Sequence, residues 1–255
     1  NNKVKLDSLP RVILVPGLGL FSIGNNNKSA KIVADLAETN INVILDAEKI
    51  GNYKTISKAN AFEMEYWSLE QAKLKKNISK RFDGKVVVIT GGCGAIGLST
   101  ATEFKKEGAE VVILDVNRKK VEDVANRLNV TAIVCNVTSK SSIKSAFKQI
   151  IELYGGVDII ISNAGAAWTG QIAEISEKDL RDSFELNFFA HQLVAKTAVN
   201  IMINQNFGGC ILFNTSKQAI NPGNRFGPYG LPKAATLFLS RQYALEYGKY
   251  NIRSN

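Results

Sequence analysis

The feature that most constrains the fold is a glycine-rich turn between an apolar strand and a helix. The strand is predicted over residues 85–89, the turn over 90–97, and the helix runs to about Lys106. Later apolar runs at 111–114, 132–134, 157–161 and 211–213 are short and rich in β-branched residues, as in strands buried on both faces. Stripes at helical spacing, over 121–128 and 143–153, lie between them. This alternation predicts an α/β fold with a doubly wound parallel sheet.

The turn itself predicts a dinucleotide site. Its sequence is Thr-Gly-Gly-Cys-Gly-Ala-Ile-Gly, and glycines let a backbone approach a pyrophosphate at a helix N-terminus. Asp115 ends the next strand, 18 residues after Gly97, where a carboxylate can accept hydrogen bonds from both ribose hydroxyls. Its charge would repel the additional phosphate of NADP, so we expect NAD as the cofactor. A turn without a ligand is the alternative, which the strand, the spacing and the acidic residue disfavour.

Three residues near the end of the chain predict acid–base chemistry on an alcohol. Tyr229 and Lys233 are four residues apart, which places them on one face of a helix, and Ser216 precedes Tyr229 by thirteen residues. A phenol beside an ammonium group and a cationic nicotinamide is favoured as phenolate, which suits it to exchange the hydroxyl proton. A serine hydroxyl can hold the substrate oxygen.

Composition excludes several other classes of protein. The chain has 255 residues, 45% hydrophobic and 22% charged, which is ordinary for a globular protein and not for a disordered one. Three cysteines without a CxxC pair and a single histidine disfavour a disulfide framework, a structural zinc site and a multi-histidine metal site. No apolar run nears the ~18 residues of a membrane span, and no signal peptide is visible. We expect a cytoplasmic protein with no membrane partner.

The net charge of +9 does not predict nucleic-acid binding, because the lysines are scattered over predicted helices. The one local concentration, at positions 73, 75, 76, 80, 81 and 85, is interpreted as a hydrated linker. A βαβ-like segment is predicted before this linker. Its strands are expected at residues 11–15 and 42–45, with a glycine turn and a helix near 28–37 between them. That first glycine turn only nearly matches a dinucleotide fingerprint, so we favour a tight turn between strand and helix. A short helix is expected at 69–76.

Residues from about Phe82 resemble a short-chain dehydrogenase/reductase. The likeness rests on the order and spacing of Thr90-Gly91…Ala95-Ile96-Gly97, Asp115, Asn163-Ala164-Gly165, Asn187, Ser216, Tyr229 and Lys233. It implies a Rossmann fold, and a small-molecule alcohol or carbonyl substrate. Tyr229 is then the general acid/base, Lys233 assists it and binds the nicotinamide ribose, Ser216 orients the substrate, and Asn187 holds a water for a proton relay.

The same resemblance implies the cofactor contacts. They fall on Gly91, Cys93, Ala95, Ile96, Gly97, Asp115, Asn136, Val137, Asn163, Ala164, Gly165, Tyr229 and Lys233, with residues 136 and 137 beside the adenine and Cys93 as a small filler. Asn136 stands where an aspartate is usual, and Ser162 where an asparagine often precedes Asn-Ala-Gly. Pro232 predicts that its helix starts close to Tyr229 or is distorted there. For His191, packing or capping is favoured over catalysis.

Residues 9–76 resemble the end of a class II, rhamnulose-1-phosphate-type aldolase, joined to a short-chain dehydrogenase in a bifunctional family of carbohydrate metabolism. Residues 9–21, 62–72 and 221–233 carry this likeness. We expect residues 1–80 to be an aldolase-type segment with a linker, and 81–255 to be an NAD-binding domain. No histidine precedes His191, so no aldolase metal site is expected in this chain.

The resemblance implies a lactaldehyde-type or sugar-alcohol substrate and a homo-oligomer in the full-length form. The missing initiator methionine, and an end at residues 251–255 where the family's sixth strand begins, lead us to expect a fragment. The alternatives are a sugar-phosphate aldolase activity of the longer protein and a non-catalytic nucleotide-binding or assembly module.

Overall fold

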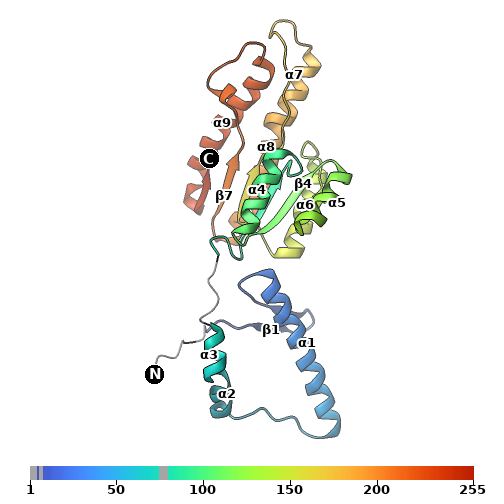
Figure 1. Cartoon of the computed structure of the whole chain (residues 1–255), viewed down its shortest axis with the longest axis vertical. Coiled ribbons are helices and arrows are strands. Elements are labelled where there is room, and N and C mark those ends of the chain that lie inside the picture. Colours follow the sequence, from blue (N-terminus) through green and yellow to red (C-terminus); the bar gives the residue numbers. More distant parts are fainter. Residues whose placement is uncertain (1–4, 6–7, 75–79) are drawn as a thin grey trace. The chain divides into compact units, whose positions relative to one another are not determined.

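The computed structural model describes residues 5, 8–74 and 80–255 (Figure 1). The chain divides into two compact units, Asn1–Gly84 and Lys85–Asn255. This division follows the boundary expected after residue 80 by four residues. Of the lysine-rich linker, residues 75–79 lie outside the described part, as do the last two residues of the helix expected at 69–76.

The second unit is built on a six-stranded parallel sheet, which confirms the predicted doubly wound fold. In the order β5-β4-β3-β6-β7-β8, the strands are Thr131–Val134, Glu110–Asp115, Val86–Thr90, Ile159–Ser162, Gly209–Phe213 and Ile252–Ser254. Every neighbouring pair is parallel. The chain runs outward from the central strand β3 to β5, then returns to β6 on the other side of β3 and runs outward again to β8.

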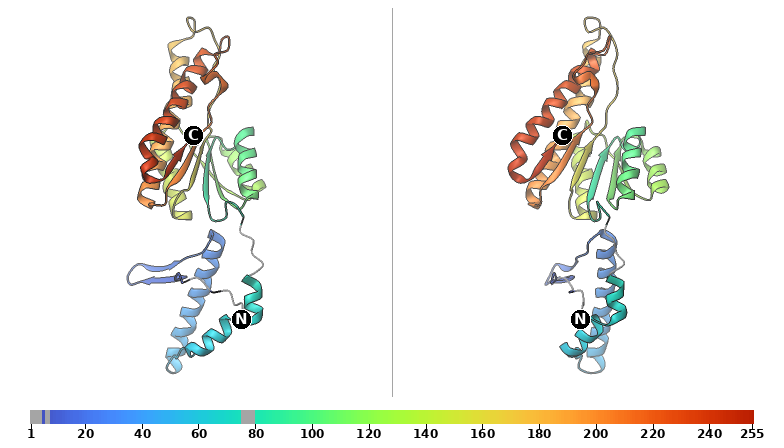
Figure 2. Two further views of the ribbon diagram at one scale, coloured as in Figure 1. Left: turned by 90° about the vertical axis from the view of Figure 1, so that its left-hand side faces the viewer. Right: turned by 60° about the vertical axis from the view of Figure 1, so that its left-hand side comes forward.

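Helices cover both faces of this sheet, which explains the uninterrupted apolar strands. The helices are α4 (Ala95–Lys106), α5 (Arg118–Leu128), α6 (Lys140–Tyr154), α7 (Glu177–Phe184), α8 (Ala190–Gln205) and α9 (Gly227–Tyr247). Every residue of β3 is buried, and Val86 and Val88 join the core made with α6, α8 and α9. Helices α4 and α5 (green) cover the opposite face from α9 (orange-red), as Figure 2 shows.

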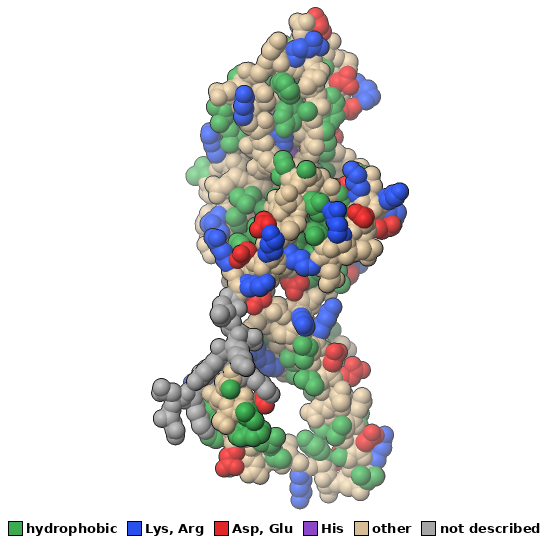
Figure 3. Space-filling view, viewed as in Figure 1, with side chains coloured by type: hydrophobic (Ala, Val, Ile, Leu, Met, Phe, Trp, Pro, Cys, Tyr) green, Lys and Arg blue, Asp and Glu red, His purple; other side chains and the backbone are tan. Residues whose placement is uncertain are grey.

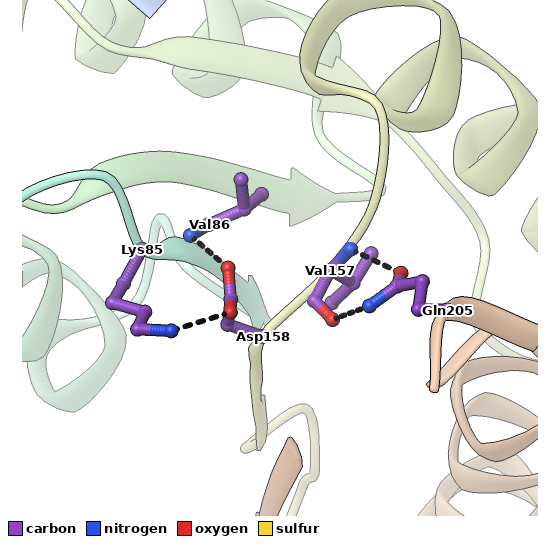
Figure 4. Close-up of polar contacts among 5 residues, drawn as sticks. All are labelled: Lys85, Val86, Val157, Asp158 and Gln205. Atoms are coloured by element: carbon purple, nitrogen blue, oxygen red, sulfur yellow. Dashed lines mark hydrogen bonds and ion pairs between the residues drawn. The ribbon is translucent and has the colours of Figure 1, made fainter. Parts of the chain in front are cut away.

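Two side chains secure the start of the central strands (Figure 4). The Asp158 carboxylate accepts the Val86 N–H at 2.9 Å and the Lys85 ammonium at 3.0 Å. The amide of Gln205, at the end of α8, accepts from the Val157 N–H at 2.8 Å and donates to its carbonyl at 2.9 Å. Backbone groups just outside the β3–β6 ladder are thereby satisfied, which fixes the start of β6 to β3 and to the end of α8.

The first unit differs from the βαβ-like expectation. Strands β1 (Val12–Val15) and β2 (Gly19–Ser22) form an antiparallel hairpin, followed by helices α1 (Asn27–Ile50), α2 (Lys58–Glu65) and α3 (Ser68–Leu74). The first glycine turn is thus the hairpin turn and not a strand-to-helix turn. Leu18 N–H donates to the Val15 carbonyl, with Gly17 at φ +76° after a proline, as in a type II turn.

The strand expected at residues 42–45 is wrong, because these residues lie inside α1. Their β-branched run favours a strand locally, but Ile41 and Ile44 continue an apolar stripe that starts at Val33 and Leu36 and lines one hollow with β1. An Asn26 cap paired with Ser29 starts the helix. Helical periodicity over the long segment therefore outweighs the local preference of four residues.

No helix in the described ranges is long and apolar enough to cross a membrane. On the face drawn in Figure 3, Lys and Arg side chains alternate with Asp and Glu and do not gather into one stripe. This face therefore lacks the clustered positive charge that binding to a phosphate backbone requires.

Candidate active site

A cavity of about 610 Å³ opens at the carboxyl ends of the central strands. It lies where β3 and β6 are neighbours and the chain leaves them in opposite directions, which is the position where open α/β sheets bind ligands. The cavity is lined by Gly91, Cys93, Gly94, Ala95, Ile96, Gly97, Asp115, Val116, Asn117, Lys120, Asn163, Ala164, Gly165, Ala166, Ala167, Asn214, Tyr229 and Lys233.

The glycine-rich turn forms one wall and offers backbone donors. Gly91 has φ +60°, a conformation that favours glycine, and a Cβ at Gly97 would lie 2.5 Å from the Gly91 carbonyl oxygen. Helix α4 follows directly, with Gly94 as its N-cap and no side chain capping it. The first N–H groups of α4 are therefore left to a ligand, and with the helix dipole they suit an anion such as a pyrophosphate.

Asp115 is held by the backbone on both of its oxygens. Its Oδ2 accepts from the Cys93 N–H at 3.1 Å, and its Oδ1 accepts from the Asn117 N–H at 3.1 Å. A carboxylate oxygen has more than one acceptor position, so both can still accept from ligand hydroxyls. Burial, and next the charge of Asp115, raise the pKa of the Cys93 thiol to about 11. The thiol therefore stays protonated, as suits a small filler in the turn.

Asn163 ties three strand ends together beside the cavity. Its side-chain amide donates to the carbonyls of Thr90 at 3.0 Å and Gly91 at 3.2 Å, and its Oδ1 accepts from Asn214 at 2.8 Å. The Thr90 hydroxyl in turn accepts the N–H groups of Asn163 and Ala164. This network fixes the glycine turn to the ends of β6 and β7.

Asn187 lies in a π-helical segment, Glu185–Phe189, between α7 and α8. Its side chain donates to the Ala166 carbonyl at 2.8 Å and accepts from the Ala166 N–H at 3.3 Å. Its own carbonyl accepts from the Thr236 hydroxyl at 2.7 Å. Asn187 therefore braces the loop after β6, and it is buried behind the cavity and does not line it. A single π-turn inside a helix is frequent at functional sites.

Helix α9 presents Tyr229 and Lys233 to the cavity. It starts at Gly227, close to Tyr229 as expected, yet Pro232 is its sixth residue and lies inside it. Proline has no N–H, so the Pro228 carbonyl, four residues earlier, lacks its helical donor. The buried hydroxyl of Ser183 supplies a replacement, donating to that carbonyl at 2.8 Å. A neighbouring helix thus compensates for the proline.

Lys233 is buried, with 3% of its surface exposed. Its ammonium donates to the Asn214 carbonyl at 2.8 Å and lies 5.8 Å from the centre of the Tyr229 ring. Burial lowers its pKa to about 8. The site therefore holds the Lys233 ammonium beside the phenol although burial disfavours its charged form. A buried lysine with a lowered pKa is typical of functional sites.

Four of the residues predicted for the site do not line this cavity: Asn136, Val137, Asn187 and Ser216. Asn136 is exposed and makes a local turn with Thr138, while Val137 is part of the core. The Ser216 hydroxyl accepts from the Gln218 N–H at 3.2 Å, capping the short helix η2 (Lys217–Ala219). The predicted roles of these residues remain predictions.

Other lining residues were missed by the sequence analysis. Asn117 caps α5 through Lys120, and both lie beside Asp115 in the wall. Asn214 follows β7 and holds Lys233 and Asn163. Its place at the carboxyl end of a central strand is the signal that could have revealed it.

Comparison with known proteins places these features in context. A family model described as short chain dehydrogenase matches residues 85–255, and one described as aldolase class II, second domain, matches residues 1–74. An uncharacterized oxidoreductase of Bacillus subtilis, YuxG, is 32% identical over 98% of this chain and 37% of its own length. The chain thus spans well under half of that relative.

Two further proteins each match more than two thirds of this chain. The (+)-borneol dehydrogenase 1 of Salvia officinalis is 34% identical over 70% of this chain and 70% of its own. A solved structure described as NAD⁺-bound xylitol dehydrogenase has 30% identity and a TM-score of 0.66, covering 69% of this chain and 70% of that one.

Proposed function

Because the chain belongs to the short-chain dehydrogenase family, we propose that it is an NAD-dependent oxidoreductase acting on a sugar-derived alcohol or carbonyl compound. The observation that carries this proposal is a single cavity with three features in its lining. These are the glycine turn before helix α4, whose N-terminus has no side-chain cap, the carboxylate of Asp115, and the Tyr229–Lys233 pair. A nucleotide site and an acid–base pair meet there, as transfer of a hydride together with a proton requires.

The residues of the cavity fit NAD. The N–H groups at the start of α4 would receive the pyrophosphate, and the Asp115 carboxylate would accept from the adenosine ribose hydroxyls. Lys120 also lines this wall. An additional ribose phosphate would need a basic partner such as Lys120 to offset the charge of Asp115, and Arg118 lies close by in the sequence. The fixed carboxylate favours NAD over NADP.

The chain's own residues would handle the proton. When bound, the nicotinamide would supply or accept the hydride. Tyr229 would move the hydroxyl proton at its phenolic oxygen, and Lys233 would stabilise the negative charge that develops there. Ser216 would hold the substrate oxygen, and Asn187 would keep the loop after β6 in place. The relative described as xylitol dehydrogenase and the aldolase-type match support a sugar alcohol or a lactaldehyde-type substrate.

Replacing the tyrosine tests the proposal. Tyr229→Phe removes one hydroxyl and no expected phosphate contact, so kcat on a sugar alcohol should fall by about 10²–10⁴ while the Kd for NADH changes little. Tyr250→Phe, at an exposed tyrosine in η3 (Gly248–Tyr250), is the control and should leave both unchanged. Turnover and NADH fluorescence are measured on the same preparations.

Two results would overturn the proposal. Near wild-type turnover by Tyr229→Phe would remove the acid–base assignment. NADH binding without substrate-dependent NADH formation, tested over sugar alcohols and lactaldehyde, would indicate a nucleotide-binding module. Separate titrations with NADH and NADPH test the cofactor preference, and equal or tighter NADPH binding would refute it.

A further inference from the structure

We propose that His191 is a positioning residue that aims the ammonium group of Lys233 into the cavity, with Ser162 fixing the proton on its ring. This inference rests on the proposed function for its catalytic consequence, but its geometric basis is independent of any substrate. His191 lies on α8, Lys233 on α9 and Ser162 on β6, so three elements meet at this point.

The contacts form a short buried chain. The His191 ring is 1% exposed, its Nε2 lies 3.3 Å from the Lys233 Nζ, and its Nδ1 lies 2.7 Å from the Ser162 hydroxyl oxygen. The ring also packs near Phe213 of β7, with ring centres 6.2 Å apart. Among the groups from α8, α9, β6 and β7 that meet here, Lys233 carries the charge, while Ser162 and Phe213 carry none.

The chemistry of the three groups permits one protonation pattern. An ammonium has three donors and no acceptor, so Nε2 of the imidazole must accept from Lys233. The proton of a neutral ring then lies on Nδ1 and is donated to the Ser162 oxygen. Burial, and next the charge of Lys233, lower the pKa of His191 to about 3, so the ring stays neutral at physiological pH. His191 therefore acts as a fixed acceptor and not as a proton carrier.

This fixed acceptor determines where the ammonium points. Of its three N–H groups, one is taken by the Asn214 carbonyl and one by His191 Nε2. The third remains for the cavity, which Lys233 lines. In the described part of the chain, no carboxylate forms an ion pair with Lys233. Two neutral acceptors therefore orient the group without neutralising its charge.

The side chains of Ser162 and His191 are complementary in size and in hydrogen bonding. The position before Asn163 carries a short hydroxyl, which leaves room for the ring and accepts from Nδ1. A longer amide there would occupy the space of the imidazole. The serine noted as a departure in the sequence is thus one half of a pair, and the histidine is the other.

The tautomer can be tested without any substrate. His191 is the single histidine of the chain, so its ring nitrogens give one unambiguous set of signals in a two-bond ¹H–¹⁵N spectrum. We expect a neutral ring protonated at Nδ1 near neutral pH. A ring protonated at Nε2, or a charged ring at that pH, would overturn the inference.

Three variants test the consequence for Lys233. His191→Leu removes the acceptor, so NADH binding should weaken by about tenfold, and its loss on the alkaline side should begin about one pH unit lower, because the buried ammonium is less stabilised. His191→Gln, whose amide oxygen can take the place of Nε2, should restore most of both. Ser162→Ala should shift the alkaline limb in the same direction by less.

The outcomes separate this inference from the proposed function. Unchanged NADH affinity and an unchanged alkaline limb in a folded His191→Leu protein would refute the positioning role even if Tyr229→Phe is inactive. If the leucine variant does not fold, Ser162→Ala decides, because an unchanged alkaline limb in this variant would refute the positioning role. Should no substrate be found, the binding and tautomer measurements still stand. If a substrate is found, the kcat of His191→Leu for that substrate should fall by a larger factor than its KM rises.

Discussion

The pairing of Ser183 with Pro232 predicts a measurable coupling between two helices. Ser183 is fully buried on α7, and its hydroxyl donates to the Pro228 carbonyl of α9, which Pro232 leaves without a helical donor. The same hydroxyl accepts from the Asn187 amide at 3.2 Å. Ser183→Ala should therefore leave one buried carbonyl unpaired, while the Asn187 amide keeps its bond to the Ala166 carbonyl.

The magnitude follows from that accounting. An unpaired buried carbonyl lowers the free energy of unfolding by about 1–3 kcal/mol. In a Pro232→Ala background the new N–H at position 232 can donate to the Pro228 carbonyl, so the loss of Ser183 should cost only about 1 kcal/mol or less. The two changes should thus couple by about 1–2 kcal/mol.

Urea unfolding of the four proteins, followed by far-UV circular dichroism, measures the cycle. The wild type, each single variant and the double variant are compared at equal m values, so that changes in midpoint report stability. Effects that add to within about 0.5 kcal/mol would show that the Ser183 hydroxyl does not substitute for the N–H that Pro232 lacks.

Other predictions follow from the contacts of the second unit. Asp158→Ala should lower the free energy of unfolding by about 1–3 kcal/mol because it strips a buried N–H of its acceptor, whereas Lys85→Ala, which removes only an exposed ion pair, should cost under about 1 kcal/mol; equal losses in urea unfolding would contradict this. Gly97→Ala should destabilise by about 1–3 kcal/mol and weaken NADH binding, since its Cβ meets the turn, while Gly248→Ala, which has open space, should be neutral or slightly stabilising by melting temperature. His191 is neutral when folded, with a pKa of about 3 against an ordinary 6.5, so the unfolded chain binds the additional proton and stability is lost as pH falls below about 6.5. Between about pH 6.5 and 5 this loss reaches about 2 kcal/mol, and His191→Gln should show a correspondingly shallower slope; identical slopes would refute the assignment.

Local patterns in the sequence were enough to predict the sheet and several residues that line the cavity. The glycine turn, Asp115 and the Tyr229–Lys233 spacing each lie within a short segment whose geometry follows from the element that carries it. Their convergence in one cavity follows from strand order, because parallel strands bring their carboxyl ends to one edge.

The contacts missed in the sequence join distant segments. Ser183 meets Pro228 across 45 residues, and His191 meets Lys233 across 42. No spacing rule reports such pairs, since they depend on how helices pack on the sheet. The strand prediction at residues 42–45 is wrong for a different reason. Four residues with a preference for strand lie within a longer apolar stripe at helical spacing, and the longer pattern determines the structure.

The position of β3 at the centre of the sheet has a consequence for synthesis on the ribosome. Its partner β4 follows within about 25 residues, but β6, which pairs with its other edge, is completed only at Ser162. At roughly 5–20 residues per second, that edge of a strand with four apolar residues out of five stays unpaired for about 4–14 s after β3 emerges. Through this interval the nascent chain presents a template for pairing with another chain. The strand order that places the cavity at the carboxyl ends of β3 and β6 therefore also sets the interval in which the growing chain exposes this unpaired edge.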